Sequence, residues 1–93
     1  MKKKLFNDGS SIEWVDKETL KYSEKEFSVL IWVDYYKIGF FKYGRVIKAS
    51  SIEKWNTEAE SSIELISANK KNEIIKKIQL YYESLNTKYR IEH

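Results

Sequence analysis

The sequence predicts an α+β fold, in which an antiparallel β-meander is packed by one long C-terminal helix. Two observations carry this prediction: apolar and polar residues alternate through the first half of the chain, and apolar residues recur at helical spacing after residue 70. Strands followed by a helix are typical of the α+β class. With 93 residues, we expect a single domain over 1–93, preceded by a disordered lysine-rich start at residues 1–4.

Turn signals divide the first quarter of the chain into short strands. Asn7-Asp8-Gly9 predicts a tight hairpin, because these residue types tolerate a positive φ. Polar triplets at residues 16–18 and 24–26 predict two further turns. The strands between these breaks are expected at residues 3–6, 11–15 and 19–23.

Residues 27–33 give the strongest strand pattern. Both of their faces are apolar, which suits the middle of a sheet that is covered at least in part on each side. We expect residues 34–37 to turn or bulge, and residues 38–43 to form the next strand with Ile38 and Phe40 in the core. Gly44 then breaks the run before another β-like segment at residues 45–49.

The C-terminal third of the chain has a helical period. Its helix is expected to begin at Ser67 or Asn69 as N-cap and to end at Asn86, over about 17–19 residues. Short strands are expected before it at residues 62–66 and after it at residues 89–91. One helix cannot cover both faces of such a sheet, so the far face is solvated, curled or covered by a partner. The apolar stripe consists of Ile74, Ile78, Tyr81, Tyr82 and Leu85.

The net charge of +3 comes from three lysines at positions 2–4, which leaves a neutral body arranged in charged blocks. Residues 35–52 contain four basic residues and no acid, whereas residues 5–34 have a net charge of −4. A neutral body disfavours strong nucleic-acid binding. The blocks either neutralise one another in the fold or present faces of opposite charge to a partner.

The composition argues against an enzyme. The chain has no cysteine, and its single histidine is His93, the last residue. Nucleophilic triads and zinc sites therefore lack their side chains, and three scattered glycines form no phosphate loop. We expect no cofactor and no metal. The longest apolar run has five residues and no signal peptide is recognisable, so we expect a cytoplasmic protein without a membrane partner.

Four segments of the chain form a recognisable series. They are Leu20-Lys21-Tyr22-Ser23-Glu24, Ser51-Ile52-Glu53-Lys54-Trp55, Ile74-Ile75-Lys76-Lys77-Ile78 and Tyr89-Arg90-Ile91-Glu92. With these segments, the chain resembles a family of small bacterial immunity proteins from polymorphic-toxin systems, most strongly in its C-terminal half. In that family a Ser-Ile-x-x-Trp element leads through an acidic loop to a helix with an Ile-rich stripe and a closing strand. One departure is Asn56-Thr57, where the family often has prolines.

This resemblance implies a non-catalytic protein-binding module that neutralises a cognate toxin by occlusion. Rigid aromatic side chains in the block of residues 35–52, which has basic residues and no acid, are suitable contact residues for a protein partner. An acidic loop containing Glu58 and Glu60 is an alternative binding face. Two other functions stay open: a nucleic-acid-binding accessory domain that uses residues 40–45, and a small dimerising domain. We expect a monomer or weak homodimer. The candidate partner-binding residues are Tyr35, Tyr36, Lys37, Lys42 and Tyr43.

Overall fold

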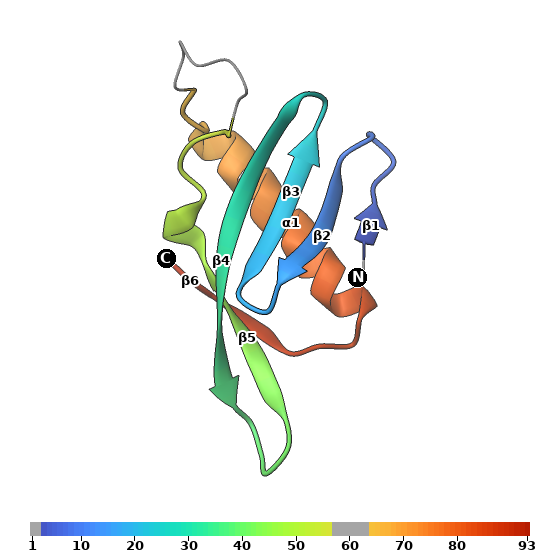
Figure 1. The fold of residues 1–93 in the computed structure, drawn as a ribbon, viewed down its shortest axis with the longest axis vertical. Coiled ribbons are helices and arrows are strands. Elements are labelled where there is room, and N and C mark those ends of the chain that lie inside the picture. Colours follow the sequence, from blue (N-terminus) through green and yellow to red (C-terminus); the bar gives the residue numbers. More distant parts are fainter. Residues whose placement is uncertain (1–2, 57–63) are drawn as a thin grey trace.

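The computed structural model describes residues 3–56 and 64–93 and has the expected α+β architecture (Figure 1). One α-helix lies across one face of a six-stranded sheet. The elements are β1 (Lys3–Leu5), β2 (Ser11–Asp16), β3 (Thr19–Glu24), β4 (Phe27–Lys37), β5 (Tyr43–Lys48), the 3₁₀ helix η1 (Ala49–Ser51), α1 (Ala68–Ser84) and β6 (Tyr89–Glu92).

The strands follow one another in sequence order across the sheet, from β1 to β6. All neighbours are antiparallel except β5 and β6, which are parallel and are connected through η1 and α1. β6 is the expected terminal strand, and it forms one edge of the sheet. The first half of β4 pairs with β3 and its second half pairs with β5, so β4 runs the length of the molecule (Figure 1).

The core lies between α1 and the sheet face that it covers. The predicted helical stripe is confirmed: Ile74, Ile78, Tyr81 and Tyr82 are each exposed by 1% or less. Of the two expected N-caps, Ser67 and Asn69, the structure has Ser67, whose Oγ accepts a hydrogen bond from the Lys70 amide at 3.1 Å. From the sheet, the core receives Ile12, Leu20, Tyr22, Val29, Ile31, Val33 and Ile47.

The predicted hairpin turn at residues 7–9 is confirmed. Gly9 has a φ of +89°, and its amide donates to the Phe6 carbonyl at 3.0 Å. The strand expected at residues 3–6 is observed as β1, which begins at Lys3. The expected disordered start at residues 1–4 is therefore wrong for Lys3 and Lys4, which pair with β2. Met1 and Lys2 lie outside the described residues.

The expected turn at residues 34–37 and the expected strand at residues 38–43 are wrong. β4 continues to Lys37, residues 38–42 form the connecting loop, and β5 begins at Tyr43. The reason is cross-strand pairing. The residues after Val33 pair with β5, and this pairing keeps the chain extended as far as Lys37. Ile38 and Phe40 are consequently outside the core, with exposed fractions of 39% and 89%.

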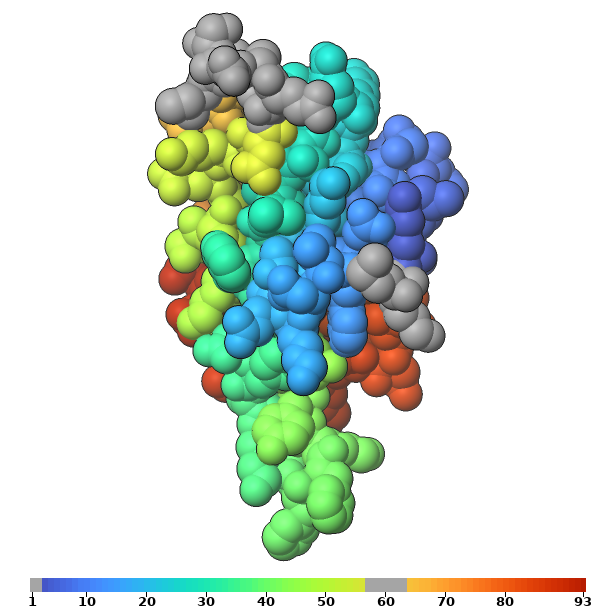
Figure 2. Space-filling model, viewed as in Figure 1, coloured from blue at the N-terminus to red at the C-terminus, as the bar shows by residue number. Residues whose placement is uncertain are grey.

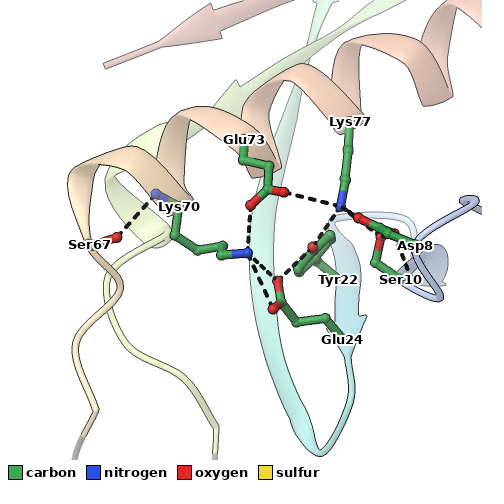
Figure 3. Close-up of polar contacts among 8 residues, drawn as sticks. All are labelled: Asp8, Ser10, Tyr22, Glu24, Ser67, Lys70, Glu73 and Lys77. Carbon is green, nitrogen blue, oxygen red and sulfur yellow. Dashed lines mark hydrogen bonds and ion pairs between the residues drawn. The ribbon is translucent and has the colours of Figure 1, made fainter.

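A polar cluster attaches α1 to the β1–β2 turn and to β3 (Figure 3). The Lys77 Nζ donates to Ser10 Oγ at 2.8 Å and to the Tyr22 hydroxyl at 3.2 Å, and it forms an ion pair with Asp8 at 2.5 Å. The hydrogen bonds from Lys77 and Ser10 hold the pKa of Asp8 well below its usual range. Burial alone would lower the pKa of Lys77, but its hydrogen bonds with Asp8 and Tyr22 outweigh this effect and raise the pKa above its usual value. Lys77 therefore stays positively charged in the folded protein.

The segment after η1 returns to the start of β4. The Asn56 amide donates to the Ser28 carbonyl at 2.7 Å, and the Trp55 ring packs on Phe27 with centroids 5.5 Å apart. Of the strand expected at residues 62–66, only residues 64–66 are described, and there Leu65 forms a single bridge with Lys54. The acidic alternative, Glu58 and Glu60, lies outside the described residues.

Candidate functional site

The β4–β5 hairpin extends beyond the body of the molecule (Figures 1 and 2). Its stem pairs Tyr35 with Arg45, Tyr36 with Gly44 and Lys37 with Tyr43. The amide of Ile38 closes the loop by donating to the Lys42 carbonyl at 2.9 Å. We call residues 37–43 the hairpin tip.

The hairpin tip exposes apolar side chains that a folded protein ordinarily buries. Phe40 and Phe41 are exposed by 89% and 95%, and Ile38 and Tyr43 by 39% and 53%. Lys37 and Lys42 flank them, and no acidic residue occurs in the tip. Apolar area of this kind is costly to leave in water and typically marks a docking surface.

The inner face of the stem is held by stacked rings around Arg45. The Arg45 guanidinium lies over the Tyr35 ring at 4.6 Å and over the Trp14 ring at 5.5 Å. Its Nη1 donates to the Tyr43 carbonyl at 3.1 Å, and the Tyr35 hydroxyl donates to the Lys17 carbonyl. These contacts join the stem to β2 and to the β2–β3 turn, so the projecting end has a rigid base.

The outer face of the stem is organised by Tyr36. Its ring lies against Gly44, where an added Cβ would come within 2.3 Å of the Tyr36 Cζ. The Arg90 guanidinium covers the same ring at 4.4 Å. Gly44 is thus required for the close approach of the Tyr36 ring. β6, which pairs with β5, supports the hairpin through Arg90.

A groove of about 490 Å³ lies between the hairpin tip and the α1–β6 connection. We call it the basic groove, because three cations line it and no acidic residue does: Lys42, Arg45 and Lys88. No ion pair joins these three to any residue that the structure describes. The buried Nε of Arg45 has no hydrogen-bond partner there. The remaining lining residues are Ile38, Tyr43, Asn86 and Thr87.

The five predicted partner-binding residues all lie in this one hairpin, in two different settings. Lys37, Lys42 and Tyr43 are exposed in the tip, whereas Tyr35 and Tyr36 are half-buried in the stem under Arg45 and Arg90. Their role in binding stays a prediction.

Sequence reasoning missed the residues that extend this site. Phe40 and Phe41 lie in the segment that the sequence predicts as a strand, with Phe40 in the core, and Arg45 and Lys88 are 43 positions apart in the sequence. The available signal was Gly39, a turn-forming residue in the middle of the segment taken for a strand. No sequence signal brings Lys88 to Arg45, because the parallel pairing of β5 with β6 does so.

A second apolar area lies on the sheet face opposite α1. Trp32, Val15 and Leu30 are exposed by 55%, 45% and 38%. Two open hollows of about 380 and 370 Å³ adjoin them. The far face of the sheet is therefore not covered by any described residue at these positions, although it is less exposed than the hairpin tip.

Among residues 3–56 and 64–93, no cluster of three or more metal-ligating side chains occurs. In the same part of the chain, no helix is both long and apolar enough to cross a bilayer. Comparison of the chain with models of protein families, with curated proteins and with solved structures finds no match.

Proposed function

We propose that this protein is a non-catalytic protein-binding module that docks on its partner through the hairpin tip. The observation that carries the proposal is the near-complete exposure of Phe40 and Phe41, at 89% and 95%, on a hairpin whose stem is rigidly held. Aromatic side chains on a pre-organised support bind with little loss of conformational entropy.

The resemblance to immunity proteins suggests the class of partner. Such a protein binds a toxin of a polymorphic-toxin system, and a projecting tip is a suitable shape for entering and occluding a recess. The cytoplasm is the compartment in which we propose that this occurs. The nucleic-acid hypothesis is less well supported, since residues 40–42 belong to a loop and not to a flat strand on which bases stack.

Genetic rescue tests this function. A toxin gene adjacent to the gene of this protein is co-expressed with the wild-type chain or with the double variant Phe40→Asp/Phe41→Asp. We expect growth with the wild type and loss of protection with the variant, because charged tips cannot enter an apolar recess. Binding of the purified proteins is measured in parallel by titration calorimetry.

The matched control changes two exposed leucines far from the tip, Leu5→Asp/Leu80→Asp, whose exposed fractions are 72% and 52%. This control should protect as well as the wild type. Equal protection by the tip variant and the wild type would refute docking through the tip. A gene neighbourhood that holds no toxin would remove the immunity role.

A further inference from the structure

The basic groove lies directly beside the hairpin tip, and Ile38, Lys42 and Tyr43 belong to both. A partner that receives Phe40 and Phe41 must therefore cover the groove as well. The charge of the groove therefore indicates which side chains the partner has around its apolar recess.

The cations of the groove differ from three other lysines of the protein, each of which forms an ion pair with an acidic side chain. Lys48 pairs with Glu92 at 2.7 Å, Lys70 with Glu73 at 2.5 Å and Lys77 with Asp8 at 2.5 Å. Lys42, Arg45 and Lys88 have no such ion pair with a described residue, although they line one groove. Three cations that line one groove without an ion pair to a described residue favour an anionic ligand.

Arg45 is half-buried, whereas Lys42 and Lys88 are exposed. The rings of Trp14 and Tyr35 restrict the guanidinium of Arg45, and its Nη1 donates a hydrogen bond to the Tyr43 carbonyl. A guanidinium carries five N–H donors, so donors remain for a planar oxyanion. The unpartnered Nε is buried and adds to the positive potential at this position.

We propose that the basic groove binds carboxylates of the partner, so that the protein docked on the tip presents acidic side chains beside its apolar recess. This inference rests on the proposed function. An acidic protein fits better than a nucleic acid, because the apolar tip needs a recess and three cations are few for a phosphate backbone. The body of the chain, residues 5–93, has no net positive charge.

Peptides test the groove separately from the tip. The full ¹⁵N-labelled chain is titrated with a hexaglutamate peptide and with a hexaglutamine peptide, both capped at their ends. We expect the hexaglutamate peptide to shift the amide signals of Arg45 and Lys88 with about millimolar affinity, and to lose this effect at about 1 M salt. The hexaglutamine peptide should cause no comparable shift.

Matched charge variants locate the binding. The pair Lys42→Gln/Lys88→Gln should weaken hexaglutamate binding by about tenfold. The pair Lys71→Gln/Lys76→Gln removes the same charge from α1 and should change the affinity by less than about twofold, through general screening alone. Equal losses in the two pairs, or no shift at Arg45 and Lys88, would overturn the carboxylate site.

A third probe separates the classes of macromolecule. Oligothymidylate that binds more tightly than hexaglutamate at equal salt would overturn the inference in favour of a nucleic acid. The double variant Phe40→Asp/Phe41→Asp is not used here, since its added charge would itself repel the peptide. Phe40→Ser/Phe41→Ser should keep hexaglutamate binding. Suppose that Phe40→Ser/Phe41→Ser still binds hexaglutamate, but that Phe40→Asp/Phe41→Asp still protects against the toxin. In that case docking through the hairpin tip is refuted, whereas the carboxylate site in the basic groove is not.

Discussion

The body of the protein and its hairpin tip use aromatic residues in opposite ways. In the body, Tyr22, Tyr81 and Tyr82 are exposed by 1% or less. In the tip, Phe40 and Phe41 are almost fully exposed. The core of the body contains neither phenylalanine of the tip, so we expect Phe40 and Phe41 to contribute little to stability. Four changes test how far stability and surface chemistry are separated.

Truncation of the core should have the largest effect. Ile78→Ala removes a fully buried side chain where α1 meets the sheet, and it should lower the free energy of unfolding by about 2–5 kcal/mol. Phe41→Ala is the control in the tip and should stay within about 0.5 kcal/mol of the wild type. Both are measured by urea denaturation. A comparable loss in the two variants would contradict the separation of body and tip.

Removal of the cation that attaches α1 to the sheet should come next. Lys77→Met keeps the apolar stem but deletes the hydrogen bonds to Ser10 and Tyr22, and we expect a loss of about 1–3 kcal/mol in the same denaturation experiment. Lys76→Met changes the exposed neighbour and serves as control. An unchanged free energy of unfolding in Lys77→Met would mean that the cluster of Figure 3 contributes nothing to stability.

A substitution in the hairpin stem tests the segment that connects the body to the hairpin tip. Gly44→Ala places a methyl group against the Tyr36 ring, whose outer end must then shift and change its contact with Arg90. Because a ring end can shift more readily than backbone, we expect a loss of about 1 kcal/mol in the free energy of unfolding. Displaced Tyr36 ring signals in NMR spectra should accompany it. Gly39→Ala, which meets nothing within 4 Å, should leave both readouts unchanged.

The smallest expected effect concerns acid. Hydrogen bonds from Lys77 and Ser10 lower the pKa of Asp8 in the folded protein, while the unfolded chain titrates near about 3.9. Below that pH the unfolded state binds more protons than the folded state, so stability falls as the pH falls. Asp8→Asn should flatten this slope of the unfolding free energy between about pH 4 and pH 2. An identical slope in both proteins would exclude Asp8 as its source.

The contrast between body and tip also marks what sequence could predict. Local signals were sufficient for the turn at Gly9 and the stripe from Ile74 to Tyr82, since each depends on near neighbours in the chain. They limited the helix cap to Ser67 or Asn69, and the structure has Ser67. The course of β4 depends on its pairing with β5, so the apolar pattern of residues 38–43 was wrongly assigned to a strand. Apolar residues predict burial only where something covers them.

The basic groove was beyond local reasoning for the same kind of reason. The cationic block at residues 35–52 was recognised, and three of the five predicted residues are exposed in the tip. Lys88 joins this block only through the parallel register that sets Arg45 opposite Tyr89. Spacing along the chain contains no trace of that register.

The parallel pairing of β5 with β6 has a consequence for the folding kinetics. β1 to β5 meet their neighbours through short connections, whereas the Lys48–Glu92 contact spans 44 positions. Closing so long a segment costs more entropy than closing a hairpin, so we expect β6 to join the sheet late. Until then β5 has an unpaired edge, and Tyr36 lacks the cover of Arg90. The β4–β5 hairpin is therefore expected to reach its final form only at the last step of folding.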